Sequence, residues 1–449
     1  MSFPRYPKYK SSGVAWLGDV PASWSVTALK RVVSPDRQIT YGIVQAGPHI
    51  PNGVPYIRPA DMSAEGGIEV PDAILRTSDE IANDYSRSTI RTGDLVFSIG
   101  PSFGKVMVTP PWLDGANLTQ GTARIAVNRD HHAKYIFWTL RAPVSVAQWD
   151  SSVGGATFRA LNLGPLSITT ILTPPLPEQT AIAEFLDRET AKIDALVAEQ
   201  RRLMDLLKEK RQAVISHAVT KGLNPNAPMK PSGIEWLGDV PAGWATGQLR
   251  YLTELIVDGT HHSPQSLPNG DYLYITAKNI KEHGFDLTEI TYVTEFQHRE
   301  IFTRCPVRKG DVLYIKDGAT AGVAMVNPLV EEFSLLSSVA LIRTMQSKLI
   351  PEFIAYQLNA SQFKNPALNG LVGGAMTRFT LELISRFVVS VPPIEEQRTI
   401  VARLDLETTK FDTLTAEAQR AIDLLQERRT ALISAAVTGQ IDVRQKPRN

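Results

Sequence analysis

The chain has 449 residues, too many for one ordinary domain, and a prior of about 150 residues per domain predicts two to four domains. Its 43% hydrophobic and 21% charged residues are typical of a globular protein with buried cores. The single cysteine, Cys305, excludes an internal disulfide, and a net charge of +1 argues mildly against a nucleic-acid-binding protein unless basic side chains are segregated on one face.

No apolar run approaches the roughly 20 residues that a membrane helix needs. The first residues, MSFPRYPKYKSSG, lack the apolar stretch of a secretory signal. Together with the single cysteine, these features predict a soluble, cytoplasmic protein.

The stretch 13–24, GVAWLGDVPASW, returns in the second half of the chain as 233–244, GIEWLGDVPAGW, so that Trp16 matches Trp236. Two tryptophans flank Leu-Gly-Asp-Val-Pro in each copy, which predicts a short ordered turn held by aromatic packing. A joint containing proline and glycine, 223–233, precedes the second copy and marks the boundary between two halves of the chain.

The stretches 25–173 and 245–391 share landmarks in the same order and at a nearly constant offset, as in Tyr56/Tyr274 and Gly93/Gly310. Such a shared framework with divergent loops indicates a duplication. Short Val, Ile, Tyr and Phe runs bounded by turn residues predict strands at Leu95–Ile99, Ala123–Val127, Leu273–Thr276, Val312–Ile315 and Val339–Ile342, and others within 166–175 and 387–393. Short helices are predicted at Ala133–Leu140 and Glu352–Leu358, so that each lobe mixes helix with a larger share of strand.

The stretches 174–221 and 392–439 predict two long helices, and their starting positions differ by the same offset as Tyr56 and Tyr274. Apolar residues follow steps of four and three, the 3.5-residue period of a coiled-coil seam. Polar residues interrupt this seam at Glu189/Glu407 and Lys210/Arg428, which we interpret as register markers. At ~1.5 Å per residue, roughly 40 residues form a rod about 60 Å long, and we expect the two rods to pair antiparallel. The residues predicted to pair the rods or to dock other subunits are Ile182, Leu186, Ile193, Leu196, Leu203, Leu207, Ile400, Leu404, Phe411, Leu414 and Leu425.

The predicted fold is therefore α+β, with two β-rich globular lobes joined by two long helices that pair as an antiparallel coiled coil, and with an internal pseudo-two-fold repeat. The predicted segments are an N-terminal segment 1–24, a first lobe 25–173, a first helical region 174–222, a linker with the second repeat opening 223–244, a second lobe 245–391, a second helical region 392–440 and a tail 441–449.

The sequence contains no P-loop, no G-x-G-x-x-G before a helix, no G-x-S-x-G elbow and no H-E-x-x-H zinc motif. It also lacks the (Asn/Asp/Ser)-Pro-Pro-aromatic string of amino-methyltransferases. The adjacent pairs His131-His132 and His261-His262 fit surface or hydrogen-bonding histidines better than metal ligands. We therefore expect no catalytic residue and no metal site.

The divergent loops contain polar, basic and aromatic residues beside glycines, a combination that suits contacts with phosphates and base edges. Any one of them could equally be an ordinary solvated loop residue, but the set recurs in both lobes, with Lys105 and Lys316 each beside a Gly-Asp strand. The candidate DNA-contacting residues are Tyr41, Gln45, Arg58, Ser102, Lys105, Arg159, Thr260, His261, His262, Lys278, Lys316, Thr320 and Arg378.

The doubled W-L-G-D-V-P-x-x-W, the YGIVQ and DGTHHSP loops, and P-P-x-x-E-Q-x-x-I leading into a long helix resemble the specificity subunit of type I restriction–modification systems. The resemblance covers essentially the whole chain, in order. It implies two target recognition domains, each reading one half of a bipartite DNA sequence, held apart by the coiled coil.

The resemblance further implies a subunit without a catalytic centre and without a directly bound cofactor. Its partners are double-stranded DNA, two modification subunits that bring S-adenosylmethionine and methylate adenine at N6, and restriction subunits that use ATP and magnesium. Because the lobes' loops differ, we expect an asymmetric target, and because rod length sets lobe separation, changes within 190–210 should alter only the spacer. The near-neutral charge indicates that the modification subunits supply part of the DNA contact.

Three alternatives remain at this point. The chain could be a free-standing two-lobed DNA-binding protein, or the specificity subunit of a methylation-only system. A two-lobed enzyme or carbohydrate-binding protein is disfavoured because catalytic motifs are absent from the sequence.

Overall fold

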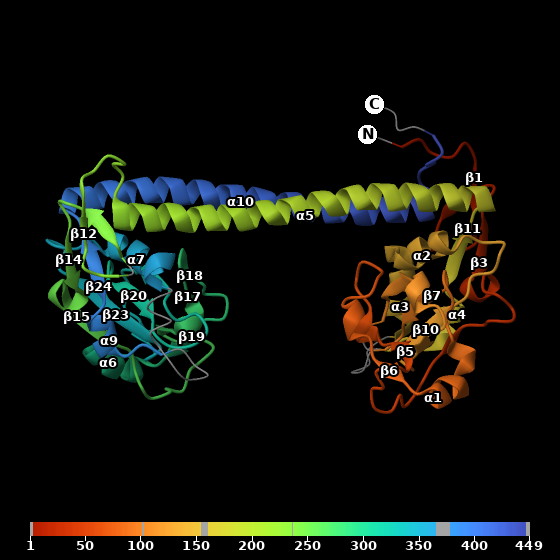
Figure 1. Ribbon diagram of the computed structural model, residues 1–449, viewed down its shortest axis with the longest axis horizontal. Coiled ribbons are helices and arrows are strands. Elements are labelled where there is room, and N and C mark those ends of the chain that lie inside the picture. Colours follow the sequence, from red (N-terminus) through yellow and green to blue (C-terminus); the bar gives the residue numbers. More distant parts are fainter. Residues whose placement is uncertain (1–2, 101–102, 154–159, 236, 365–377, 446–449) are drawn as a thin grey trace. The chain divides into compact units, whose positions relative to one another are not determined.

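The computed structural model describes residues 3–100, 103–153, 160–235, 237–364 and 378–445 (Figure 1). The chain divides into two compact units, unit 1 with Met1–Gln200 and Arg420–Asn449 and unit 2 with Arg201–Gln419. Each unit contains one globular lobe and one end of each of the two long helices, so the units do not follow the order of the sequence.

Lobe 1 is built on an antiparallel four-stranded sheet in the order β4-β10-β7-β8. Successive side chains of a strand point to opposite faces, and the central strand β7 uses both. Leu95 and Phe97 face a core shared with helix α2 and the long helices, whereas Val96 faces a second core with Ile57 and Leu118. The strands of this sheet are β4 (Thr40–Tyr41), β7 (Leu95–Ser98), β8 (Val106–Val108) and β10 (Thr122–Ile125).

A second, three-stranded sheet, β6-β5-β9, covers the other face of lobe 1, and α2 lies next to the long helices (Figure 1). A two-stranded ladder, β3-β11, leads the chain into and out of the lobe. The remaining elements of unit 1 are β1 (Tyr9–Ser11), β2 (Asp19–Pro21), β3 (Ser25–Ala28), β5 (Val54–Ile57), β6 (Arg76–Thr77), α1 (Asp79–Asp84), β9 (Asn117–Leu118), α2 (Ala133–Arg141), α3 (Pro143–Val153), α4 (Leu163–Ser167) and β11 (Thr170–Thr173).

Lobe 2 repeats this plan, with a four-stranded sheet β15-β23-β20-β21, a three-stranded sheet β19-β16-β22 and a ladder β14-β24. Val312 and Tyr314 face the core next to the long helices, and Leu313 and Ile315 face the second core. Its elements are β12 (Met229–Pro231), β13 (Asp239–Pro241), β14 (Ala245–Gln248), β15 (Thr253–Asp258), β16 (Tyr272–Ile275), β17 (Ile280–Lys281), β18 (Gly284–Phe285), β19 (Thr291–Val293), α6 (Glu295–Arg304), β20 (Val312–Ile315), β21 (Ala324–Val326), β22 (Ser334–Leu335), β23 (Val339–Thr344), α7 (Pro351–Asn359), α9 (Leu381–Ser385) and β24 (Val388–Val391).

The predicted mixed α+β fold is confirmed, and the predicted strands and short helices coincide with observed elements. One difference is the stretch 166–175, whose start belongs to helix α4, with the strand β11 beginning only at Thr170. Pro165 lies in the first turn of α4, where proline costs no hydrogen bond. The residues of both V-G-G-A strings, apart from Val153, lie outside the described residues.

The long helices are α5 (Leu176–Lys221) and α10 (Ile394–Val437), each starting after a Pro-Pro pair. The glutamine of the P-P-x-x-E-Q motif has the same role at both starts. Gln179 donates to the Pro174 carbonyl (2.8 Å) and accepts from the backbone N–H of His132 (2.9 Å), the residue that precedes α2. Gln397 likewise donates to Pro392 (2.8 Å) and accepts from Ile350 N–H (2.8 Å), before α7. The motif thus joins each long helix to the short helix of its lobe.

Within unit 1 the two long helices run antiparallel, because rising residue numbers on α5 meet falling numbers on the other side. Glu178, near the start of α5, pairs with Arg444, just beyond the end of α10 (3.4 Å). Further along α5, Asp194 pairs with Arg429 of α10 (2.9 Å).

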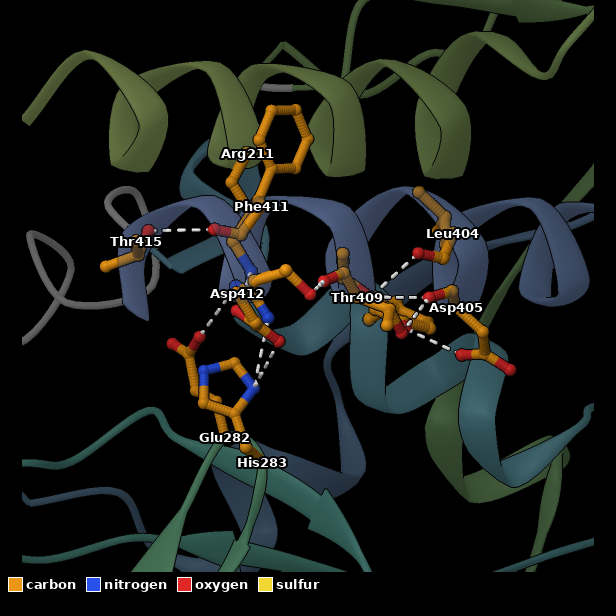
Figure 2. Close-up of polar contacts among 12 residues, drawn as sticks. Arg211, Glu282, His283, Leu404, Asp405, Thr409, Phe411, Asp412 and Thr415 are labelled. Carbon is orange, nitrogen blue, oxygen red and sulfur yellow. Dashed lines mark hydrogen bonds and ion pairs between the residues drawn. The ribbon is translucent and has the colours of Figure 1, made fainter. Parts of the chain in front are cut away.

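The helices are also antiparallel within unit 2. Arg211 of α5 pairs with Asp412 of α10 (3.7 Å; Figure 2), and Gly222, just after α5, lies beside Glu396 near the start of α10. The step from Asp194 to Arg211 along α5 equals the step from Asp412 to Arg429 along α10, so the helices have the same register in both units.

The observed seam differs from the predicted one at three of the predicted apolar positions. Leu196, Leu203 and Leu414 are 50, 42 and 45% exposed, whereas Val197 and Met204, one residue after the first two, are buried and half-buried. At the first two positions the leucine and the residue after it are both apolar, so a 3.5-residue period fits either residue. Packing against the partner helix determines which of the two is buried. The other predicted seam residues are buried or half-buried, namely Ile182, Leu186, Ile193, Leu207, Ile400, Leu404, Phe411 and Leu425.

The four residues predicted as polar register markers do not lie at the centre of the observed seam. Lys210 and Arg428 are exposed, and Glu189 and Glu407 are half-buried beside it. Their places are taken by Thr190/Thr408, which bond to carbonyls of their own helices, and by Arg211/Arg429, whose ion pairs cross between helices.

The two copies of the W-L-G-D-V-P-x-x-W element pack against the ends of the long helices. In unit 1, Trp24 donates to the buried Glu178 near the start of α5 (2.9 Å), and Pro21 lies against Gly439 after α10. In unit 2, Trp244 packs beside Gly222, which follows α5. Both glycines have positive φ (72° and 75°), the usual conformation just after a helix. No described helix contains an apolar stretch long enough to cross a membrane.

Candidate nucleic-acid interface

The two loops predicted to contact DNA, 41–45 and 258–263, which we call the reading loops, occupy equivalent places at the edge of the main sheets. Each makes one parallel bridge, Ile43 to Thr119 in lobe 1 and Thr260 to Leu336 in lobe 2. A Cβ at Gly42 or Gly259 would lie 1.9 Å from the carbonyl oxygen of Leu118 or Leu335. Only glycine permits this close crossing of two backbones, which fixes where the neighbouring side chains project.

In lobe 2 this loop is anchored by a buried carboxylate. Asp258, 2% exposed, contacts the imidazole of His261 (3.1 Å), the guanidinium of Arg304 (2.9 Å) and the amine of Lys316 (3.4 Å). Lys316 is itself 2% exposed and also pairs with Asp317 (3.1 Å). The amine of Lys316 thus forms its ion pairs inside the protein, where it stabilises the loop through Asp258, and Lys316 does not lie on the surface.

The expected equivalence of Lys105 and Lys316 is wrong. Lys316 follows the central strand of its sheet, and the residue in that place in lobe 1 is Ile99, since the backbone N–H groups of Lys316 and Ile99 donate to matching carbonyls, Ser338 and Gly121. Lys105 lies on the next strand connection, where its amine donates to the Met62 carbonyl (2.6 Å).

A hollow of about 830 Å³ lies beside the reading loop of lobe 2, bounded by the turn 276–279, the hairpin β17-β18 and residues 336–338. Lys278 and Lys281 line it, together with hydroxyls from Thr276, Thr288 and Thr291. Lys281 also approaches Asp286 (3.7 Å), and both side chains are open to solvent. Glu289 also lines the hollow, so two lysines and two carboxylates balance in charge. The lysines and hydroxyls still offer donors for phosphate and base-edge contacts.

The same turn in lobe 1 carries different chemistry on one backbone. Arg58 and Asp61 form a reciprocal cap in which the Asp61 carboxylate accepts from Arg58 N–H (2.7 Å) and pairs with its guanidinium. In lobe 2 the neutral residues Thr276 and Asn279 form this cap. The framework is shared, and the charges that it presents are not.

The structure places the predicted DNA-contacting residues at different depths. Exposed residues are Tyr41, Gln45, His261, His262, Lys278, Thr320 and Arg378; half-buried residues are Arg58, Lys105 and Thr260; Lys316 is buried; Ser102 and Arg159 lie outside the described residues. A hollow of about 410 Å³ against α6 is lined by His261, His262 and Arg304. Arg304 was not among the residues predicted from the sequence, because its place beside the loop depends on its ion pair with Asp258.

The pKa of the cysteine near the loop of lobe 2 is shifted mainly by burial. Desolvation raises the pKa of the Cys305 thiol to about 12, with further contributions from the charges of Asp258 and Asp311, so this thiol stays protonated. Among the described residues, no group of three or more His, Cys, Asp or Glu side chains could hold a metal ion.

Comparison with known proteins gives one consistent answer. A family model described as type I restriction modification DNA specificity domain matches residues 47–202 and 241–422, one match in each half. The specificity subunit of the type I restriction enzyme EcoBI from Escherichia coli is 23% identical over 341 residues, covering 74% of this chain and 71% of that protein. The EcoKI specificity subunit from Escherichia coli strain K12 is 24% identical over 303 residues, covering 66% and 62%.

Solved structures agree in fold. A chain from a study of assembly and conformational transition of a type I restriction–modification system aligns over 93% of this chain and 98% of its own, with a TM-score of 0.69 and 19% identity. The HsdS subunit from Thermoanaerobacter tengcongensis aligns over 94% and 98%, with a TM-score of 0.53 and 21% identity. The chain belongs to the family of type I restriction–modification specificity subunits.

Proposed function

We propose that this specificity subunit reads an asymmetric bipartite DNA target, one half-site with each lobe. The observation that carries the proposal is the pair of reading loops, which cross the sheet edge at equivalent glycines, Gly42 and Gly259, and then present different side chains. Tyr41 and Gln45 flank the crossing in lobe 1, and His261 and His262 follow it in lobe 2. Equivalent backbones that carry different side chains support two lobes that recognise different DNA sequences.

The separation of the half-sites follows, in this proposal, from the long helices. α5 begins in unit 1 and ends in unit 2, and α10 runs from unit 2 back to unit 1. The cross-helix pairs of Asp194 with Arg429 and Arg211 with Asp412 hold the helices in one register. A helix of fixed register has a fixed rise per residue, which suits a spacer of fixed length.

We also propose that the outer face of the long helices docks methyltransferase subunits. In unit 1, Leu196 and Leu424 are 50 and 64% exposed; in unit 2, Leu203, Leu206 and Leu414 are 42 to 52% exposed. Each precedes a seam residue by one position, so in either unit they lie on the same side of the helix pair. Exposed leucines gathered on one side mark a protein contact. One structural relative comes from work on the assembly of a type I restriction–modification complex, which supports a docking role.

The subunit itself performs no chemistry in this proposal. S-adenosylmethionine would be bound by the modification subunits, and ATP and magnesium by restriction subunits, in the cytoplasm where the DNA lies. The side chains of this chain bind and orient DNA, and the described residues hold no candidate metal cluster.

The test of recognition is the methylome of the source strain with and without this gene. Loss of one bipartite N6-methyladenine motif on deletion, with unequal half-sites, is the expected result. An unchanged methylome in a strain whose methyltransferase is active would refute the proposal, and loss of a palindromic motif would refute the assignment of one reader to each half-site.

The test of docking uses Leu206→Gln combined with Leu424→Gln, which should abolish co-purification with the methyltransferase subunit without changing the melting temperature. Leu406→Gln is the matched control, because Leu406 is 52% exposed on α10 but does not precede a seam residue. If the double variant still co-purifies, the docking face lies elsewhere. A chain that binds its DNA target fully without any methyltransferase would instead be a free-standing DNA-binding protein.

A further inference from the structure

Lobe 1 contains an arginine-lined hollow that the sequence did not reveal. Its volume is about 590 Å³, and its lining comes from residues 35–40, residues 86–91 and strand β10. Four arginines belong to it, Arg37, Arg87, Arg91 and Arg124. They come from three separate stretches of the sequence, with Arg87 and Arg91 in one of them, and the fold brings the three together.

Two of these arginines form the floor. Arg37 makes a two-pronged pair with Asp94, with Nη1 at 2.8 Å from one carboxylate oxygen. Arg124 is 5% exposed and donates to the carbonyls of Thr89 (3.0 Å) and Gln38 (3.2 Å), while its buried Nε has no partner among the described residues. Burial and then the nearby charge of Arg37 lower the pKa of Arg124, and the charge of Asp94 acts in the opposite direction.

The other two arginines form the rim. Arg87 and Arg91 are exposed, and no ion pair of their side chains is found among the described residues. Asp36 is the one carboxylate among the lining residues, and Asp94 is already paired from below. The carboxylate of Asp114, outside the hollow, also interacts with the charges of Arg91 and Arg37. Four guanidinium groups against three carboxylates leave a surplus of one positive charge at the hollow.

The hollow adjoins the reading loop of lobe 1. Thr40, immediately before that loop, lines it, and the guanidinium of Arg87 lies 6.0 Å from the centre of the Tyr41 ring. Hydroxyls of Ser86 and Thr89 also belong to the lining residues. A ligand held by Arg87 would therefore lie beside the side chains that we assign to base reading.

We propose that this hollow binds a phosphate group of the DNA backbone next to the half-site contacted by lobe 1. The proposal rests on the proposed function and assigns to it a positioning site. Guanidinium groups match phosphate oxygens in a two-pronged geometry, and phosphate contacts set the register of a protein on DNA without reading its sequence. The arginines then fix where Tyr41 and Gln45 meet the base edges.

The experiment uses the complex reconstituted with its methyltransferase subunits and carrying Arg87→Gln with Arg91→Gln. DNA affinity is measured against salt concentration, on the cognate duplex and on a duplex of scrambled sequence. Loss of this phosphate contact should reduce the slope of log affinity against log salt by about 1 and should weaken both duplexes by a similar factor. Arg87→Lys with Arg91→Lys retains the charge and should keep most of the slope.

The matched control is Lys8→Gln with Lys10→Gln, which removes two exposed positive charges from unit 1 outside the lobe, on or beside strand β1. A slope for the arginine variant no different from this control would overturn the inference. Melting temperatures verify that all variants are folded. If the unmodified complex shows no sequence preference at all, the proposed function fails. If it prefers the cognate duplex but the arginine variant behaves as the lysine control, only the phosphate site fails.

A second arm separates DNA phosphate from free phosphate. Inorganic phosphate is titrated against the unmodified complex and the glutamine variant at physiological salt. Weak binding of free phosphate together with a reduced DNA slope is the expected outcome. Tight binding of free phosphate with an unchanged DNA slope would overturn the assignment to the DNA backbone.

Discussion

The two lobes place the same buried aspartate at the start of the same strand, yet they pair it differently. Asp94 in lobe 1 and Asp311 in lobe 2 each accept a 2.7 Å hydrogen bond from a backbone N–H three residues earlier. The guanidinium that neutralises Asp94 comes from Arg37, ahead of the sheet, whereas Asp311 is paired with Arg343 on strand β23. The local turn is the same in both lobes, and the long-range partner differs.

This difference shows which parts of a repeat can change independently. A turn bond requires only residues near in sequence, so both copies keep it. A charge partner can come from any strand that reaches the carboxylate, and each choice frees a different surface. In lobe 1 the choice of Arg37 places it among the arginines of the phosphate-binding hollow.

The equivalent arginines of the two long helices, Arg211 and Arg429, show a similar contrast. In unit 1, the guanidinium of Arg429 lies 5.8 Å from the Trp138 ring as well as beside Asp194. In unit 2, Arg211 also contacts Glu282 (3.3 Å) and the His283 ring (3.2 Å) from the hairpin β17-β18, as Figure 2 shows. One helix pairing thus supports two different contacts with the lobes.

The largest expected effect comes from lengthening what both units share. Inserting seven residues after Gln200 of α5 and after Ile422 of α10 preserves the seam and extends each helix by ~10 Å, about three base pairs of DNA. The methylated target should keep both half-sites and gain about three bases in its spacer. Sequencing of methylated DNA checks this, and methylation confined to the original spacing would exclude the helices as the ruler.

A second prediction concerns the glycine crossing that both lobes share, which is altered in one lobe at a time. Gly42→Ala and Gly259→Ala each place a Cβ 1.9 Å from a carbonyl oxygen, which should displace the loop and destabilise the lobe by about 2 to 4 kcal/mol. Because the backbones are equivalent, both should abolish target methylation. Gly164→Ala and Gly243→Ala, whose added Cβ would meet nothing within 4 Å, are the controls. Methylation rate and melting temperature are the measurements, and unequal effects of the two loop variants would contradict a common frame.

A third prediction addresses the buried Lys316 of lobe 2, whose place in lobe 1 is taken by Ile99. Lys316→Met removes one partner of the buried Asp258, and since Arg304 and His261 remain, we expect a loss of about 2 to 3 kcal/mol of unfolding free energy. Ile99→Met, at the equivalent place in lobe 1, should cost less than about 1.5 kcal/mol. Chemical denaturation compares the two. Equal losses would show that the Lys316 charge adds nothing beyond its volume.

The smallest effect concerns the two cross-helix pairs. Asp194→Asn leaves Arg429 without a carboxylate at this distance, whereas after Asp412→Asn the guanidinium of Arg211 keeps Glu282. Partly exposed pairs contribute about 0.2 to 1 kcal/mol, so Asp194→Asn should cost more than Asp412→Asn within that range. Denaturant midpoints measured at low and high salt give the comparison, and the reverse order would mean that the hairpin contact does not support Arg211.

The sequence alone determined the repeat, the landmarks of the lobe boundaries, the long helices and the family, because these depend on periodicity and on residues near one another in the chain. Glycine crossings such as Gly42 and Gly259 were also visible as loop signals, although not the carbonyl that each one passes. Only the tertiary structure decided between Leu196 and Val197, since both are apolar and the packing of the partner helix chooses. It also decided that Lys316 is buried and that Arg37, Arg87, Arg91 and Arg124 meet, because burial and charge clustering depend on strands that are distant in sequence and adjacent in space.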